Sequence, residues 1–488
     1  MLRLNKELKA SEYRSLYDVI IPKDHILRKI KENIDFSFVN PMLKKSYCET
    51  FGRPAKEPEM MFKLLFLKKL YDLSDEALIQ NANVNMAYKY FLGLDPEDEM
   101  IDSSLLAKFR KLRITEDMLE EILCETVRQA IEKGIIKSNA IIVDATHTKT
   151  SAKHETPTQI LRRLTKELRK EIYKTQHELS EKFPDKPQET ADLSEEIEYS
   201  KQLIEKVNNP VDEFGTEKSK KLLAKVKDLL ENDKIKEIQS VADEDAKLGY
   251  KSEGNSFFGY KSHIAMTEER IITGLEVTTG EAPDGPELIK LIEQSVENGI
   301  AVKEVLGDTA YSGKGNLEYA KENGIALISK LNPVISNGNG QQKEGFAYNK
   351  DANMYQCPAG HLATRKANED RSKAGKNNRI VYYFDTKKCK SCPMREGCYK
   401  DGAKKKTYNV TILSEAHKEQ KEFQESEYFK KRARERYKIE AKNAELKQVH
   451  GLEKADSVGI VPMQLQSYFT AFVANVKRIV KLAKVDAV

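Results

Sequence analysis

The sequence predicts an α/β core that carries three acidic residues on two strands and one helix. Residues 140–146 form a short β-branched apolar run that includes Asp144, the pattern of a buried strand with a carboxylate at its tip. A second apolar run, after Glu304, leads into Asp308, where glycines allow a tight turn around the acid. A late helical segment carries Glu440. Taken alone, each aspartate is as consistent with a structural role in a turn or a helix cap as with a role in a functional site.

Residues 1–125 are predicted to form a helical domain. Residues 57–67 begin a buried helix directly after the turn at residues 52–54. Ser74, which two acids follow, has the pattern of an N-cap for the next helix.

The predicted core occupies residues 135–150 and 250–335. After the first strand we expect two antiparallel strands, a helix, the strand that leads into Asp308, and a short last strand; these lie at residues 257–265, 271–278, 287–297, 304–308 and 325–329. Together they predict a mixed five-stranded sheet flanked by helices.

A charged helical insertion is predicted at residues 151–249. Apolar residues recur at every fourth position from Ile160 to Ile172. Pro184, Pro187 and Pro210 are expected to divide the insertion into two or three antiparallel helices. The apolar stripe is interpreted as the core of a hairpin, with a partner surface as the alternative.

Residues 340–410 concentrate four of the six cysteines. Cys389 and Cys392 form a C-x2-C pair, Cys398 follows six residues later, and Cys357 lies upstream. Four thiolates suit a tetrahedral, closed structural zinc site, with His361 as the reserve ligand. Free reduced thiols are the alternative. Residues 415–488 complete the chain as helices that carry the third acid.

The segment around the third acid has one distinctive helical face. At 3.6 residues per turn, Arg436, Glu440 and Lys447 share a stripe with Asn443 beside it. An isolated segment of this kind is usually a solvated face with ordinary ion pairs. The two upstream acids favour a site instead, because clustered carboxylates need divalent cations among them. Mg²⁺ suits such a site, since it binds one or two carboxylates together with substrate phosphate oxygens.

These motifs resemble the DDE transposases of bacterial insertion sequences, which have an RNase H-like catalytic core. Their signature of Arg, three residues, Glu, six residues and Lys is met by Arg436, Glu440 and Lys447. The Tyr that usually precedes the Arg by three residues is replaced by Ala433. Further similar segments are residues 91–94, 101–104, 449–452 and 474–478. The resemblance is closest to the groups named IS-five and IS-eleven-eighty-two, and it covers nearly the whole chain.

The resemblance implies roles for individual residues. Asp144, Asp308 and Glu440 would hold two catalytic Mg²⁺ ions, with Mn²⁺ as the alternative. Contacts to DNA phosphates would come from Arg436, Lys447, Lys261 and Asn443. Lys261 and His263 match a Lys-x-His pair of the family, although a surface lysine and an internally bonded histidine are nearly as consistent with the sequence. Asp284 also matches a family position, and as a lone turn acid it is interpreted as structural.

The same resemblance implies that the N-terminal domain binds the transposon ends and contributes to dimerisation; a purely structural helical domain is the alternative. The partners expected are the terminal inverted repeats and target DNA, with a homodimer in the synaptic complex. Similar Cys-Pro segments interrupt the core of the eleven-eighty-two group.

Composition limits the other possibilities. The 82 basic and 77 acidic residues leave a net charge of only +5, so nucleic-acid binding must be argued from local clusters such as residues 430–436. Two isolated cysteines, the absence of a leader and the lack of a long apolar stretch predict a cytoplasmic protein that does not enter membranes.

The predicted function is DNA cleavage and strand transfer at the terminal inverted repeats by two-metal phosphoryl transfer. One alternative is an inactive, domesticated transposase that acts as a DNA-binding regulator. The other is a different nuclease with an RNase H-like core.

Overall fold

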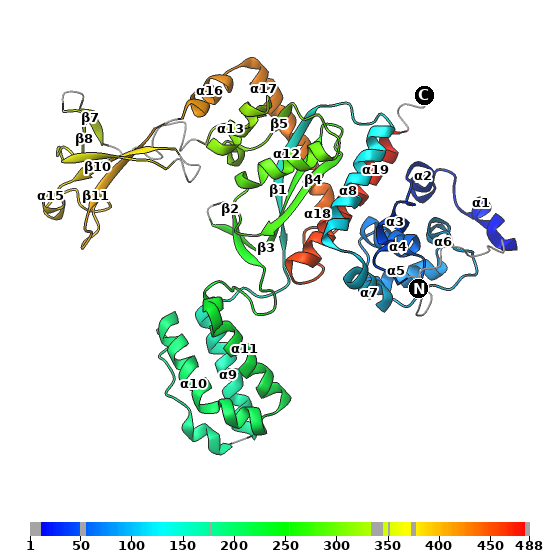
Figure 1. Ribbon diagram of the computed structural model, residues 1–488, viewed down its shortest axis with the longest axis horizontal. Coiled ribbons are helices and arrows are strands. Elements are labelled where there is room, and N and C mark those ends of the chain that lie inside the picture. Colours follow the sequence, from blue (N-terminus) through cyan, green and yellow to red (C-terminus); the bar gives the residue numbers. More distant parts are fainter. Residues whose placement is uncertain are drawn as a thin grey trace.

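The computed structural model describes residues 11–48, 55–175, 177–252, 254–332, 345–349, 352–371, 377–412 and 414–483. Figure 1 shows a central sheet with helices on its faces, N-terminal helices on one side, a helical bundle extending from the core, and a small sheet module projecting in another direction. Within the described part of the chain, none of the helices combines the length and apolar character needed to cross a membrane.

The N-terminal region is helical and shares its core with the rest of the protein. Its helices are α1 (Leu16–Ile20), α2 (Ile26–Asn33), α3 (Val39–Lys44), α4 (Pro58–Leu70), α5 (Asp75–Val84), α6 (Met86–Leu92), α7 (Ser104–Arg113) and α8 (Glu116–Glu132). Phe62 and Phe66 of the buried α4 pack against Phe472, with ring centroids 5.3 and 5.8 Å apart. Because Phe472 belongs to the last helix, the two ends of the chain are packed together.

Among the described residues, the central sheet has six strands. They are β1 (Ala140–Lys149), β2 (Lys247–Ser252), β3 (Asn255–Thr267), β4 (Ile272–Thr279), β5 (Glu304–Leu306) and β6 (Ala326–Ile328). Their order is β2-β3-β1-β5-β6, and β4 also pairs with β3. The β1–β3 pairing is antiparallel, whereas β1–β5 and β5–β6 are parallel. The helices α12 (Leu288–Glu297) and α13 (Lys314–Glu322) connect the later strands.

This mixed sheet with flanking helices is compatible with an RNase H-like core. The prediction of five strands was wrong, because β2 adds a sixth. Residues 247–252 contain only one large aliphatic side chain and lack the alternation of a typical strand. The strand is held instead by its ladder to the first part of β3.

The helical insertion lies between β1 and β2. It consists of α9 (Pro157–Thr175), α10 (Leu193–Phe214) and α11 (Glu217–Leu230), which bury their own apolar clusters. Leu168 and Ile172 of the predicted stripe are buried among Leu203 and Val207 of α10. Pro210 was expected to end a helix but lies inside α10. Because proline has no N–H, α10 lacks one intrahelical hydrogen bond at this position but continues to Phe214.

The cysteine-bearing module comprises β7 (Ala347–Asn349), β8 (Met354–Gln356), β9 (Arg365–Glu369), β10 (Arg379–Phe384), α15 (Thr386–Lys390) and β11 (Lys406–Thr411). Strands β9, β10 and β11 form a three-stranded antiparallel sheet. A small cluster around Phe346, Phe384 and Tyr408 is its core, separate from the main one.

The C-terminal helices return the chain to the central sheet. They are α16 (Glu415–Phe423), α17 (Glu427–Ala433), the short turn η7 (Arg434–Arg436), α18 (Tyr437–Gln448) and α19 (Ile460–Leu482). In α19, Asn475 accepts a hydrogen bond from the backbone N–H of Ile272 (2.7 Å) and donates one to its carbonyl oxygen (2.8 Å). This amide pairs with the free backbone groups of β4 as another strand would.

Candidate active site

Parallel strand pairing brings Asp144 and Asp308 to the same edge of the sheet. In the β1–β5 ladder Ile142 is opposite Leu306. Each aspartate lies two residues beyond its member of this pair, so the two acids occupy equivalent positions in the register. Asp308 follows β5, but Asp144 lies inside β1, opposite Ile264 of β3, so the prediction that Asp144 is at the tip of its strand was wrong. The short helix η5 (Thr309–Tyr311) begins directly after Asp308, whose carboxylate accepts a hydrogen bond from the N–H of Ala310 (2.8 Å). Asp308 is therefore an N-cap as well as a candidate ligand.

The carboxylate of Asp144 lies in an unusual electrostatic environment. Its side chain is 19% exposed. Burial raises the pKa of Asp144 to about 6, and the nearby Asp308 and Asp284 also raise it, while Arg436 opposes them. A carboxylate with this shift gains from any bound cation, because a positive charge stabilises its ionised form.

Helix α18 and the turn before it contact Asp144 through two residues. Asn443 Nδ2 donates a hydrogen bond to Asp144 Oδ2 (3.0 Å). Arg436 Nη1 lies 3.9 Å from Asp144 Oδ1, and Arg436 Nη2 donates to Glu440 Oε1 (2.6 Å). Glu440, 58% exposed, therefore approaches Asp144 through the guanidinium and makes no direct contact. The helical stripe predicted from the sequence does face the acids, with Arg436 between the first and the third.

Lys447 lies farther along the same helix, beside the end of β1. Its Nζ is 3.2 Å from His147 Nδ1. Burial lowers the pKa of Lys447 to about 8, helped by Lys251. Burial and Lys447 lower the pKa of His147 to about 4, and its ring packs on Phe257 with centroids 4.9 Å apart. Lys251 and Lys149, which also lower the pKa of Lys447, give Lys447 surroundings that would favour an anion. His147 was missed by the sequence analysis, because one histidine in a strand has no distinguishing spacing.

Lys261 is paired inside the protein. Its Nζ donates to Asp284 Oδ1 and to the carbonyl oxygen of Ala282, both at 2.8 Å. The buried His263 shares a hydrogen bond with Thr278 Oγ1 (2.8 Å). Asp284 had been interpreted as a lone turn acid, yet it lies near enough to raise the pKa of Asp144. Folding thus adds a fourth carboxylate to the neighbourhood of the three predicted acids.

Tyr311 is buried near Asp144, Asp284 and Asp308, and no sequence pattern singles it out. It is 1% exposed, and its hydroxyl has no hydrogen-bond partner among the described residues. Burial, followed by Asp144, raises its pKa well above the usual value. The sequence offers one weak signal for it, its position three residues after Asp308 in a glycine-bounded turn.

The basic cluster at residues 430–436 is partly used for internal contacts. Arg432 pairs with Glu304 and, at 3.0 Å, with Glu268, which attaches α17 to the sheet. Arg436 is engaged by the acids described above. This reduces the number of cations that the cluster offers to an external phosphate.

Among the residues that the structure describes, no group of three or more His, Cys, Asp or Glu side chains is arranged to hold a metal ion. The chemistry around Asp144 nevertheless suits a divalent cation. Asp308 and Asp284 lie close enough to raise the pKa of Asp144, and all three aspartates raise the pKa of Tyr311. Asn443 Oδ1 is buried there without a hydrogen-bond partner among the described residues. Oxygen ligands of this kind are those that Mg²⁺ prefers.

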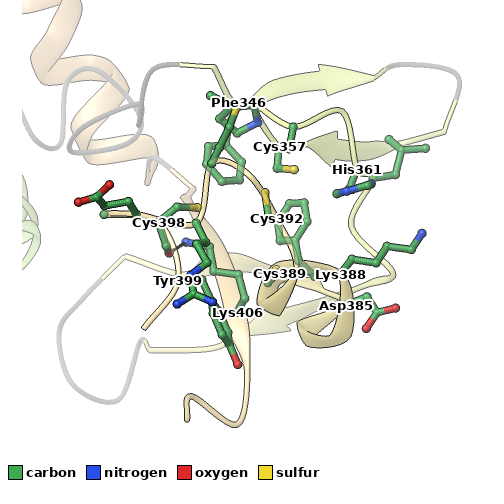
Figure 2. Close-up of a pocket in the computed structure, with 18 of the residues that line it drawn as sticks. Phe346, Cys357, His361, Asp385, Lys388, Cys389, Cys392, Cys398, Tyr399 and Lys406 are labelled. Atoms are coloured by element: carbon green, nitrogen blue, oxygen red, sulfur yellow. Dashed lines mark hydrogen bonds between the residues drawn. The ribbon is translucent and has the colours of Figure 1, made fainter. Parts of the chain in front are cut away.

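The four cysteines predicted as zinc ligands line one cavity of about 370 Å³ in the small module, together with His361 (Figure 2). Burial raises the pKa of the Cys389 thiol, and the proximity of Cys398, Cys357 and Cys392 contributes. The thiols come from the β8 end, from α15 and from the loop that follows it. Folding therefore brings together cysteines that are up to 41 positions apart in the sequence.

Comparison with known proteins identifies two segments. Residues 15–112 match the family described as "Transposase domain (DUF772)", and residues 356–480 match the family described as "Transposase DDE domain". The second match includes the cysteine cavity, α18 and most of α19. A curated relative, "Uncharacterized protein ORF8 in nfe locus" of Rhizobium meliloti, is 33% identical over 92 residues, 18% of this chain. The chain spans 44% of the length of that relative. With both matches in chain order, the two family models support a bacterial insertion-sequence DDE transposase.

Proposed function

We propose that this protein cleaves DNA at the terminal inverted repeats of an insertion sequence and joins the freed ends to target DNA. The placement of Asp144 and Asp308 at equivalent positions of adjacent parallel strands carries the proposal. Glu440, linked to Asp144 through Arg436, supplies the third acid. Asp144, Asp308 and Glu440 would hold two Mg²⁺ ions. These ions, when bound, would activate the attacking oxygen and stabilise the leaving one.

The protein's own residues would bind and orient the reacting strand. In the first reaction a water oxygen attacks the phosphorus, the bond to the 3′-oxygen breaks, and that oxygen leaves as a 3′-hydroxyl after taking up a proton. In the second, this 3′-hydroxyl loses its proton and attacks a phosphorus of the target strand, the bond from that phosphorus to the target's 3′-oxygen breaks, and that oxygen takes up a proton and leaves as a 3′-hydroxyl. Lys447, the anion-favouring cation beside β1, would contact the phosphate next to the scissile one. Arg436 would exchange its carboxylate partners for phosphate. Phosphate contacts of this kind orient the strand without reading its sequence.

Recognition of the repeats is assigned to the N-terminal helices, which would also contribute to a homodimer in the synaptic complex. This domain shares its core with α19 through Phe62, Phe66 and Phe472. Because the packing is continuous, the position of bound DNA on the N-terminal helices would be fixed relative to the sheet.

A structural zinc ion would be held by Cys357, Cys389, Cys392 and Cys398. The support for this proposal is that the four thiols line one cavity, although among the described residues they are not arranged in metal-binding geometry. Zinc binding needs thiolates drawn into a tetrahedron, and the module's small apolar core gives it little other stabilisation. A closed site of four protein ligands would order the module and would take no part in phosphoryl transfer.

The decisive experiment needs the repeats, which sequencing of the DNA around the gene would supply. Purified protein would then be incubated with Mg²⁺, a duplex that carries one repeat with flanking DNA, and a plasmid target. We expect a nick at the repeat boundary and end DNA joined to the plasmid. Free ends without joined products would indicate a nuclease. Repeat binding without either product would indicate a regulator, and both outcomes would contradict the proposal.

A further inference from the structure

The positive charge of this protein is concentrated in the cysteine-bearing module. Residues 346–411 contain 15 Lys and Arg against 6 Asp and Glu, whereas the rest of the chain contains 67 against 71. The core and the other domains are therefore slightly acidic taken together. A net charge of +5 for the whole chain hides this division.

Within the module the charge gathers at one end, residues 385–406, here called the lysine-rich tip. The tip carries eight basic residues and three acidic ones. Two of the acids are occupied: Asp385 caps α15 by accepting from the N–H of Lys387 (2.9 Å), and Asp401 pairs with Arg395 (3.0 Å). Six lysines of the tip are exposed, and no carboxylate among the described residues forms an ion pair with any of them: Lys387, Lys388, Lys390, Lys400, Lys404 and Lys405.

Strand pairing brings the two groups of lysines together. Phe384, the last residue of β10, is opposite Lys406, the first residue of β11. The chain enters α15 directly after Phe384, while Lys404 and Lys405 directly precede Lys406. Both groups therefore leave the same end of one ladder. In Figure 1 this end, marked by α15, lies far from the central sheet, so the core does not cover it.

The cysteines hold the segments that carry these lysines. Cys389 lies between Lys388 and Lys390, and Cys398 is two residues before Lys400. The carbonyl oxygen of Cys398 accepts a hydrogen bond from Lys406, which ties the cysteine loop to β11. Figure 2 shows Lys388 and Lys406 next to the cysteine cavity. The arrangement of the cysteines in the cavity therefore determines how far apart the lysines of the tip lie.

From these observations we infer that the lysine-rich tip is a second DNA-binding surface, which contacts the phosphate backbone of duplex DNA away from the catalytic edge. Unpaired lysines from two segments complement a duplex, which carries one negative charge per about 1.7 Å of axis. The contacts are electrostatic and carry no base information. The inference rests on the proposed function only in taking DNA as the substrate.

The test compares two full-length variants with equal loss of charge. The first replaces five tip lysines by Gln: Lys387, Lys388, Lys390, Lys404 and Lys405. The matched control replaces five exposed lysines of α9 and α10 that form no ion pair with described residues: Lys166, Lys170, Lys174, Lys201 and Lys206. A third variant, with Arg at the five tip positions, keeps the charge. Affinity is measured by salt titration on a repeat duplex with and without flanking DNA and on an unrelated duplex.

The tip Gln variant should lower the slope of log affinity against log salt by about 2 to 4, at about 0.9 per lost phosphate contact. The control and the Arg variant should keep the slope of the unmodified protein. If the salt slope falls only on the repeat duplex with flanking DNA, the tip contacts the flanking DNA. If the slope falls equally on all three duplexes, the tip binds DNA of any sequence. A slope equal to that of the control, with unchanged thermal unfolding, would overturn the inference. Because binding is read without cleavage, an inactive protein would refute the proposed function alone.

Discussion

Asn443 of α18 donates a hydrogen bond to Asp144 of β1 across 299 positions of sequence, with Nδ2 and Oδ2 3.0 Å apart. This bond connects the helix of the third candidate acid to the strand of the first. Arg436, in the turn before the helix, approaches the same acid at the longer distance of 3.9 Å. Together with the contact between Lys447 and His147 (3.2 Å), the amide joins α18 to β1.

Replacement of the acids should separate binding from chemistry. We expect Asp144→Asn, Asp308→Asn and Glu440→Gln each to abolish strand cleavage while repeat binding is retained, because each would remove a ligand of the proposed Mg²⁺ ions. Strand cleavage is measured on a denaturing gel, and repeat binding is measured by an electrophoretic mobility shift. Glu217→Gln, at an acid that is 90% exposed in the insertion, is the control and should cleave normally. Cleavage by Asp144→Asn at the unmodified rate would remove this residue from the site.

The stability of the protein without divalent ions should depend on pH through Asp144. Its folded pKa of about 6 is raised above the ordinary value of 3.8. The folded state therefore binds more protons than the unfolded state between these values, and the free energy of unfolding should fall as the pH rises from about 4 to 6. Asp144→Asn should remove this decrease and stabilise the protein at pH 7 by about 1–3 kcal/mol. Urea unfolding across this pH range measures the free energy of unfolding. The same dependence on pH in the unmodified protein and in Asp144→Asn would contradict the raised pKa of Asp144.

Mg²⁺ affinity should show the opposite pH dependence. A carboxylate must lose its proton to bind a cation, so affinity should rise as the pH passes about 6. Isothermal titration of the unmodified protein with Mg²⁺ at several pH values between 5 and 8 tests this. Affinity that is constant over that range would show that Asp144 does not titrate in the site.

The zinc content of the protein should depend on Cys389 and Cys392. Purified protein should contain about one zinc per chain, and the combined Cys389→Ser and Cys392→Ser substitution should remove it, because two thiolates cannot close a tetrahedral site. Cys48→Ser with Cys124→Ser, outside the module, is the matched control and should keep the metal. Elemental analysis decides, and zinc-free protein from a reduced, unchelated preparation would favour free thiols.

Arg436 and Lys447 should contribute to DNA affinity without sequence preference. Their combined replacement by Ala should lower the salt slope by about 1.8, the value for two phosphate contacts. Affinity should fall equally for repeat and scrambled duplexes, because phosphate contacts carry no base information. A salt titration on both duplexes provides the measurement. An unchanged slope would mean that Arg436 remains with Asp144 and Glu440 when DNA binds.

Local patterns in the sequence were enough to predict much of the fold. Antiparallel strands at residues 257–265 and 271–278 could be predicted because their apolar and β-branched content is a local property. A helix with Glu440 and Lys447 on one stripe could be predicted because helical periodicity depends only on spacing, although Arg436 lies in the short turn before that helix. Strand β2 could not, because its pairing depends on a partner and its own sequence has no strand pattern.

What only the tertiary structure decided is which groups meet at the sheet edge. Residue types and spacing determined by themselves that Asp144 and Asp308 end apolar runs and that four cysteines share one region. The approach of Asp284 to Asp144, the burial of Tyr311 near them and the position of Arg436 between two acids depend on how distant segments pack. Such contacts have no local signal, since desolvation and charge proximity act through space and exist only after the chain has folded.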